Sequence, residues 1–120
     1  MRRNRLGSRG PELSAIGFGA WEAGGGSEWG DPPPEEQVLR AIRTVFETGI
    51  DWIDTAEVYG RGRSEELVAR AIAGRRDEVL IATKVAPRPE GSGFRPAQVR
   101  SACEGSLRRL GTDHVDLYQL

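Results

Sequence analysis

Three polar residues of the chain have side chains that together can carry out acid–base chemistry on a carbonyl group. Asp54 ends one apolar segment, Tyr59 follows five residues later, and Lys84 ends another apolar segment. A cation beside a phenol favours its phenolate form, and such a phenol can give a proton to a carbonyl oxygen and take it back. A buried ammonium group needs a carboxylate partner, for which Asp54 is the natural candidate. The three residues are therefore suited to polarising a carbonyl and protonating a developing alkoxide.

Lys84 also stands out in the composition. It is the single lysine among 17 basic residues, all the others being arginine. A lysine at this one position indicates that the site requires a compact point charge rather than a planar guanidinium group. The alternative is a structural role, in which Lys84 only pairs with a carboxylate and orders a loop.

The composition excludes several other classes of protein. The net charge of −1 argues against a dedicated nucleic-acid binder. With one cysteine and one histidine, the chain has no disulfide framework and no Cys-rich or multi-histidine metal site. No segment approaches the ~18 consecutive apolar residues of a membrane span, and the basic N-terminus lacks the apolar stretch of a secretory signal. We expect a cytoplasmic protein without a metal, nucleic-acid or membrane partner, and its oligomeric state is open.

The polar residues must be positioned by alternating strands and helices. The expected elements are a hairpin over 1–14, strands over 15–19, 50–55, 79–83 and 115–120, and helices over 34–48, 64–73 and 96–110. Ser64 is the expected N-cap of the second helix, and Gly49, Gly74 and Gly111 are the expected helix stops. This order is typical of parallel βαβ units in an α/β protein. A doubly wound sheet and a (β/α)₈ barrel both fit it.

In either architecture the carboxyl ends of the strands share one face, where ligands bind. Side chains alternate along a strand, so Asp54 points to the same side as Trp52, and Lys84 to the same side as Ala82. The pattern therefore predicts that Asp54 and Lys84 point inward from adjacent strands.

At these residues the chain resembles a known family. The segment Asp54–Gly60 reads Asp-Thr-Ala-Glu-Val-Tyr-Gly and is similar to the aldo-keto reductase signature Asp-Thr-Ala-x-x-Tyr-Gly. Further segments resemble the family in the same order: 16–21, 60–66, 82–85, 106–113 and 116–120. Each motif is weak alone, but together they are collinear over essentially the whole chain.

The resemblance implies a fold and a reaction. The fold would be the N-terminal half of a (β/α)₈ TIM barrel with an N-terminal hairpin, so that residues 1–120 are a fragment forming one partial domain of a barrel that needs ~250 residues. The intact protein would reduce aldehydes and ketones with NADPH and without a metal. Tyr59 would be the general acid, Lys84 would stabilise its phenolate, and Asp54 would pair with Lys84.

The resemblance also assigns binding residues. Gly19, Ala20, Trp21 and Asp54 would contact the cofactor, and Trp21 and Val58 would border the substrate pocket. Trp29, in the loop after the first strand, is a further candidate for a substrate contact.

The family's catalytic histidine would follow Leu120, where this chain stops, so we expect the fragment to be inactive alone. His114 precedes the last strand and is expected at the opposite end of the barrel. Cys103 is expected in the core, and Tyr118 is expected to pack against a helix.

Other interpretations stay open. Potassium-channel beta subunits show that the family can also serve as a non-catalytic NADPH-binding accessory subunit. A chance resemblance on an unrelated half-barrel is the third interpretation. The sequence does not identify the carbonyl substrate or distinguish NADPH from NADH.

Overall fold

The computed structural model describes residues 1–26, 30–86 and 94–120. Its strands are β1 (Arg3–Arg5), β2 (Glu12–Ser14), β3 (Phe18–Gly19), β4 (Trp52–Asp54), β5 (Leu80–Lys84) and β6 (Leu117–Gln119). Its α-helices are α1 (Glu35–Arg43), α2 (Val45–Thr48), α3 (Arg63–Ala71) and α4 (Pro96–Leu110). Three short 3₁₀ helices are also present: η1 (Glu22–Gly24), η2 (Tyr59–Gly62) and η3 (Arg76–Glu78). Within the described ranges, no helix has the length and apolar character needed to cross a membrane.

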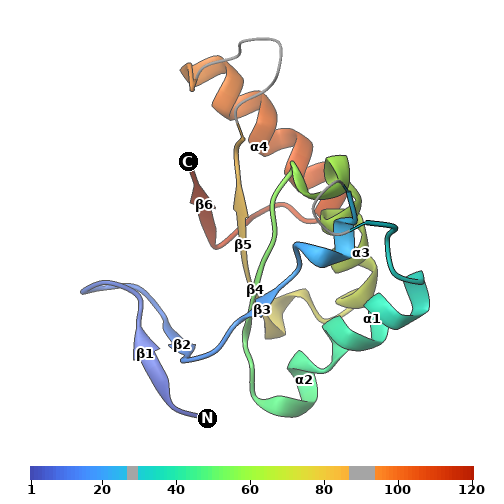
Figure 1. Ribbon diagram of the computed structural model, residues 1–120. Helices are drawn as coiled ribbons and strands as arrows, with labels where there is room; N and C mark the ends of the chain where they lie inside the picture. Colours follow the sequence, from blue (N-terminus) through green and yellow to red (C-terminus); the bar gives the residue numbers. More distant parts are fainter. Residues whose placement is uncertain (27–29, 87–93) are drawn as a thin grey trace.

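Strands β3 to β6 form one parallel sheet whose spatial order follows the order of the chain. A doubly wound sheet would reverse direction at a switch point, so the sequential order matches the barrel alternative. Figure 1 shows the helices together on one side of this sheet, and the hairpin of β1 and β2 lies apart from them. Within the described chain, β3 and β6 are the edge strands of this sheet.

The core lies between the sheet and the helices. Ile53 of β4 and Ile81 of β5 face each other in the register, and neither has exposed surface. Helices α1 and α3 pack against each other, and each buries a stripe of apolar residues at helical spacing. The buried residues of these stripes are Val38, Leu39 and Ile42 of α1, and Leu67, Val68 and Ala71 of α3.

The hairpin is attached to the amino end of β4. The Ser14 amide donates to Asp51 Oδ1 at 2.9 Å, and the Trp52 indole donates to the Ser14 carbonyl at 3.0 Å. Arg3 forms an ion pair with the other oxygen of Asp51 at 2.5 Å. Burial alone would raise the pKa of Asp51, but the hydrogen bonds from Ser14 and the charge of Arg3 outweigh it and hold this pKa below its ordinary value.

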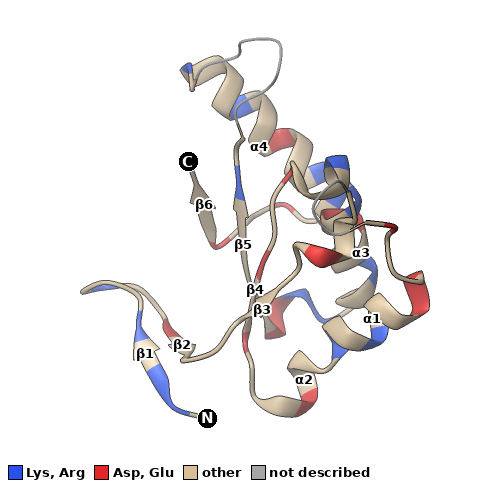
Figure 2. Ribbon diagram, in the orientation of Figure 1, with Lys and Arg blue, Asp and Glu red and all other residues tan. Residues whose placement is uncertain are grey.

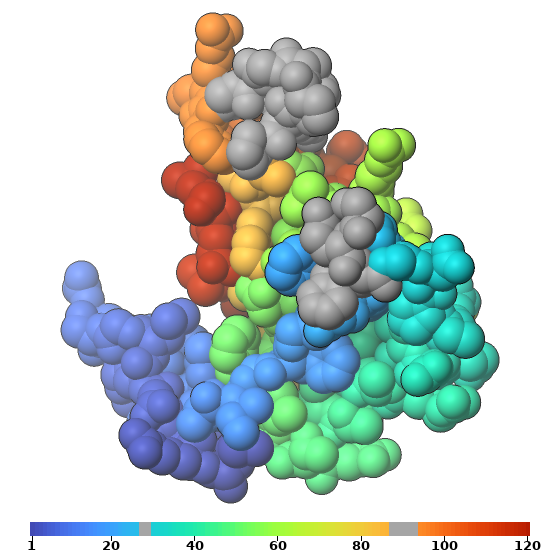
Figure 3. All heavy atoms as spheres, in the orientation of Figure 1, coloured from blue at the N-terminus to red at the C-terminus, as the bar shows by residue number. Residues whose placement is uncertain are grey.

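A hollow of about 390 Å³ separates the hairpin from the inner face of the sheet. In Figure 3 it lies between the blue N-terminal segment and the red C-terminal strand. Leu6 and Leu13 line it from the hairpin, and Trp52, Leu80 and Leu117 line it from the sheet. This face is the one to which alternation assigned Asp54, which also lines the hollow.

Two predicted helices differ from the structure in detail. The single helix expected over 34–48 is divided at Thr44, whose hydroxyl donates to the Ala41 carbonyl at 2.6 Å and competes with the helical backbone. Helix α4 begins at Pro96 and ends before Gly111, as expected, but its buried positions include Gly105 and Ser106. The core position expected for Cys103 is wrong, because that residue is only half-buried.

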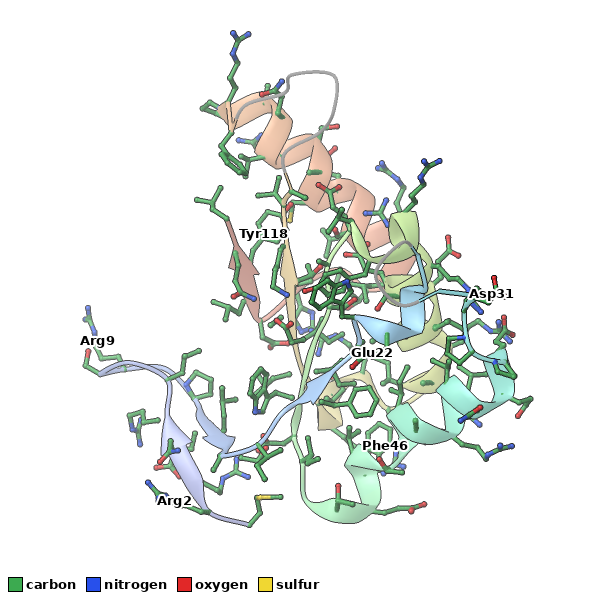
Figure 4. All side chains as sticks on the ribbon, viewed as in Figure 1. Arg2, Arg9, Glu22, Asp31, Phe46 and Tyr118 are labelled. Carbon is green, nitrogen blue, oxygen red and sulfur yellow. The ribbon has the colours of Figure 1, made fainter. Side chains whose placement is uncertain are left out.

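Tyr118 lies on β6 (Figure 4), and its hydroxyl is buried without a hydrogen-bond partner among the described residues. Burial, followed by the neighbouring Cys103 of α4, raises the pKa of Tyr118 to about 12. The expected packing of Tyr118 against a helix stays a prediction.

Candidate active site

Lys84 lies at the centre of the candidate site. Its ammonium group donates to Asp54 Oδ2 at 2.7 Å, to the Tyr59 hydroxyl at 3.1 Å and to the Thr55 carbonyl at 3.0 Å. A lysine ammonium has three N–H donors, so each of them has a partner here. The structure thus brings together the three residues that the sequence singled out.

The register of the sheet explains this meeting. Asp54, the last residue of β4, pairs with Ala82 of β5, and Lys84 is two residues further along β5 on the same side. In Figure 2 the basic residue at the end of β5 is blue and the acidic residue of β4 is red. Tyr59 begins η2, which returns its phenol to the same strand ends. Both members of the ion pair remain about one-third exposed.

Gln119 is a neighbour that the sequence reasoning missed. It lies opposite Lys84 in the register of β6, and its side-chain amide donates to Asp54 Oδ1 at 3.3 Å. Both oxygens of Asp54 are therefore engaged, one by Lys84 and one by Gln119. Parity along the fourth predicted strand could have found this contact.

The aromatic ring of Tyr59 stacks on Trp21, with ring centroids 5.7 Å apart and an angle of 21° between the planes. Both rings line an open pocket of about 740 Å³ beside the Lys84 cluster. Val58 also lines this pocket and is largely exposed. The remaining lining residues are Gly25, Gly26, Gly60 and Arg61.

The other sequence candidates have different surroundings. A Cβ atom on Gly19 would meet no atom within 4 Å, so open space adjoins the end of β3. Ala20 has only 1% of its surface exposed, its amide donates to the Asp54 carbonyl, and its carbonyl accepts from Ser64. The side chain of Ala20 therefore does not line the pocket beside Tyr59. Trp29 lies outside the described residues.

His114 lies in the segment before β6 and contacts Asp113 at 2.7 Å. It shares a surface hollow with Arg3 and Asp51, which lie at the hairpin end of the sheet. The expectation that His114 lies away from the strand ends that carry Lys84 is confirmed.

Ser64 is not the N-cap that the sequence predicted. Gly62 occupies the N-cap position, with a φ of 96°, and Ser64 is fully buried. Its hydroxyl donates to the Ala20 carbonyl at 2.6 Å and lies 2.9 Å from the Thr55 hydroxyl. The tertiary contacts engage this hydroxyl, so it does not cap its own helix.

Comparisons with known proteins agree on one family. The model of the Aldo/keto reductase family matches residues 15–120. The chain is 42% identical to the aldo-keto reductase YhdN of Bacillus subtilis, with all of the chain and 38% of YhdN covered. Among solved structures, the holo form of aldo-keto reductase AKR11C1 from Bacillus halodurans matches with a TM-score of 0.84 and 36% identity, over 100% of this chain and 40% of that one.

An aldo-keto reductase from Klebsiella pneumoniae, solved in complex with NADPH, matches with a TM-score of 0.75 and 38% identity, over 98% of this chain and 39% of that one. The chain thus spans about two fifths of the length of these relatives. The similarity confirms the expected fold, the N-terminal half of a (β/α)₈ barrel. Because the family model matches most of the chain, the chain belongs to the aldo/keto reductase family.

Proposed function

We propose that the protein containing this chain reduces aldehydes or ketones to alcohols with a nicotinamide cofactor, NADPH. The observation that carries the proposal is the position of the Lys84 ammonium, which contacts both Asp54 and the Tyr59 hydroxyl beside an open pocket. Family membership supports it, and so does the solved relative from Klebsiella pneumoniae that is in complex with NADPH.

In this proposal Tyr59 acts as the general acid. Its hydroxyl donates a proton to the carbonyl oxygen of the substrate as negative charge develops there. Lys84 donates a hydrogen bond to the tyrosine oxygen and stabilises the phenolate that remains. Asp54 holds the ammonium in place at 2.7 Å, and the Thr55 carbonyl occupies its third donor.

The side chains present fit a site that a hydride donor completes. Asp54, Tyr59 and Lys84 can move and stabilise protons, but protein side chains do not release hydride. A bound nicotinamide supplies hydride to the carbonyl carbon. The open space beside Gly19 and the partly exposed ring of Trp21 are suited to a flat ring at the same strand ends.

The substrate would occupy the pocket next to Tyr59. Trp21 and Val58 border this pocket with exposed apolar surface. Buried apolar surface contributes binding energy without requiring a particular polar group. We therefore assign Trp21 and Val58 to the substrate pocket.

The test uses a full-length chimera, in which residues 1–120 replace the matching segment of Bacillus subtilis YhdN. We expect the chimera to oxidise NADPH in the presence of a reactive aldehyde. Because general acid catalysis contributes about 10²–10⁴-fold, Tyr59→Phe should lower kcat by at least about 100-fold. Cofactor binding, measured by fluorescence titration, should persist in this variant.

Two results would count against the proposal. Unchanged turnover in the Tyr59→Phe chimera would show that Tyr59 is not the acid. A folded parental chimera that binds NADPH but reduces no aldehyde or ketone would instead support the accessory-subunit interpretation.

A further inference from the structure

The first turn of α3 contacts the carboxyl ends of three adjacent strands. Ser64 and Glu65 follow each other in this turn, and neither has exposed surface. Ser64 reaches the Ala20 carbonyl after β3 and the Thr55 hydroxyl after β4. Glu65 Oε1 accepts a hydrogen bond of 2.7 Å from the Thr83 hydroxyl of β5. One helical turn therefore connects the strand ends that carry the candidate site.

Arg109 of α4 connects this turn to the loop that carries Tyr59. Its Nε donates to Glu65 Oε2 at 2.6 Å, and its Nη2 lies 3.8 Å from Glu57 Oε2. The other oxygen of Glu57 accepts from the Ala86 amide at 3.1 Å. These contacts fall on the chain two residues before Tyr59 and two residues after Lys84.

The packing around Arg109 leaves room for this arrangement. A Cβ atom on Gly62 would lie 2.4 Å from Arg109 Cδ, and one on Gly105 would lie 3.2 Å from Arg109 Nη1. Gly62 also has a φ of 96°, which favours glycine. Two backbone positions thus have no side chain where the guanidinium group passes between α3 and α4.

Glu65 needs this cation. A carboxylate without exposed surface loses its hydration, and buried charges persist in proteins when they are paired and hydrogen-bonded. Arg109 supplies the charge and Thr83 supplies a further hydrogen bond. The ion pair therefore joins α3 to α4, and the hydrogen bond from the Thr83 side chain ties it to β5, one residue from Lys84.

We propose that Glu65 and Arg109 are positioning residues, which hold Lys84 within hydrogen-bonding distance of Asp54 and Tyr59. Neither residue touches the tyrosine oxygen or the ammonium group. They act through the segments on either side: Glu65 through Thr83, and Arg109 through Glu65 and Glu57. The consequence for catalysis rests on the proposed function, whereas the position of Lys84 can be measured without turnover.

The single lysine of the 120-residue chain makes this position measurable. Selective ¹³Cε-lysine labelling gives one side-chain NMR signal, which comes from Lys84. The same chain in denaturant provides the reference signal of a lysine without tertiary contacts. In the folded parental chain the signal should differ from this reference, because the ammonium contacts Asp54 and Tyr59. Coincidence of the two signals would overturn the proposal.

Glu65→Gln is the main variant, because it keeps the size of the side chain and removes its charge. We expect its Lys84 signal to move toward the denatured reference while the circular dichroism spectrum remains that of a folded chain. The matched control is Glu66→Gln, an exposed glutamate of the same helical turn. The control should leave the Lys84 signal at the parental position.

Two further variants keep the test decisive if Glu65→Gln does not fold. Thr83→Val keeps the ion pair and the side-chain shape but removes the hydrogen bond to Glu65. Arg109→Lys keeps the charge but loses the planar guanidinium fork, with exposed Arg108→Lys as its control. Both should displace the Lys84 signal. A parental Lys84 signal in the folded Thr83→Val and Arg109→Lys chains would overturn the proposal.

The catalytic consequence is measured separately in the YhdN chimera. Because a displacement of about 1 Å can reduce turnover by about 100-fold, Glu65→Gln should lower kcat by about 10- to 100-fold and leave cofactor binding in place. If the parental chimera has no reductase activity, the proposed function fails, and the NMR signal still decides the positioning role. If Glu65→Gln retains parental kcat in an active chimera, the positioning role fails alone.

Discussion

Replacement of Lys84 by methionine removes the central group of the candidate site while keeping an unbranched side chain. The ammonium makes three hydrogen bonds, to Asp54, Tyr59 and the Thr55 carbonyl. Hydrogen bonds to charged groups contribute about 1.5–3 kcal/mol each, but Lys84 and Asp54 are about one-third exposed, so water replaces part of the loss. We expect the free energy of unfolding to fall by about 1–3 kcal/mol.

The effect on reduction should be larger than this loss of stability explains. One of the lost hydrogen bonds joins Lys84 to the Tyr59 oxygen, and among the described residues no other cation donates a hydrogen bond to this oxygen. If that bond contributes about 1.5–3 kcal/mol to the transition state, kcat falls about 10- to 150-fold. The assay is NADPH oxidation by the YhdN chimera at saturating aldehyde, with the folded fraction determined by urea denaturation.

Lys84→Arg separates charge from geometry in the same assay. The guanidinium group keeps the positive charge but replaces a compact ammonium by a planar fork. We expect it to restore part of the stability and only a small part of kcat. A Lys84→Met chimera that is folded and turns over at the parental rate would refute the assignment of Lys84 to the acid–base unit.

Three further predictions concern stability and assembly. Because the pKa of Asp51 is held below 3.8, its contribution to the free energy of unfolding is complete above that pH and is lost as the pH falls through the folded-state pKa. Asp51→Asn should lower the unfolding free energy by about 1 kcal/mol at neutral pH and make the stability measured by urea denaturation depend less on pH in the acid range. An unchanged acid dependence would contradict this. Gly17→Ala places a Cβ atom 2.2 Å from the Trp52 ring and should destabilise the chain by about 1–3 kcal/mol in thermal or urea unfolding. Gly19→Ala adds a Cβ atom that meets no other atom within 4 Å and should have little effect on stability. Equal stability of the two variants would be the opposing result. The 120-residue chain alone should show no NADPH-dependent reduction and should self-associate in sedimentation experiments through the edges of β3 and β6; a monomeric chain with robust turnover would contradict both statements.

The positions of Asp54 and Lys84 could be predicted because they follow from local rules. Alternation along a strand assigns each side chain to a face, and parallel pairing brings the carboxyl ends of neighbouring strands together. The position of Tyr59 could not be predicted in this way. Tyr59 lies in a turn, and the periodicity of strands and helices does not determine the path of a turn. Its selection rested on the chemistry of a phenol beside a lysine, and its role as general acid on the resemblance of the segment Asp54–Gly60 to a family signature.

The contacts behind the site could not be predicted by the same rules. Ser64 and Glu65 have the composition of an ordinary helix N-terminus, and the sequence predicts Ser64 as its N-cap. Their partners Ala20 and Arg109 are each 44 residues away in the chain, so only the packing of α3 against the strands and α4 brings them together. Cys103 is only half-buried because the face that α4 buries is formed largely by small residues, Ala102, Gly105 and Ser106. Apolar spacing along the sequence does not identify such a face.

In the proposed mechanism Tyr59 donates the proton, and the second tyrosine, Tyr118, does not. The most direct measurement compares kcat for aldehyde reduction in Tyr59→Phe and Tyr118→Phe chimeras, with NADPH binding determined on the same samples. Tyr118 is a suitable control because its hydroxyl has no hydrogen-bond partner among the described residues. We expect both variants to bind NADPH, Tyr118→Phe to retain parental kcat, and Tyr59→Phe to lose at least about 100-fold in kcat. Equal kcat values for the two variants would show that Tyr59 is not the proton donor.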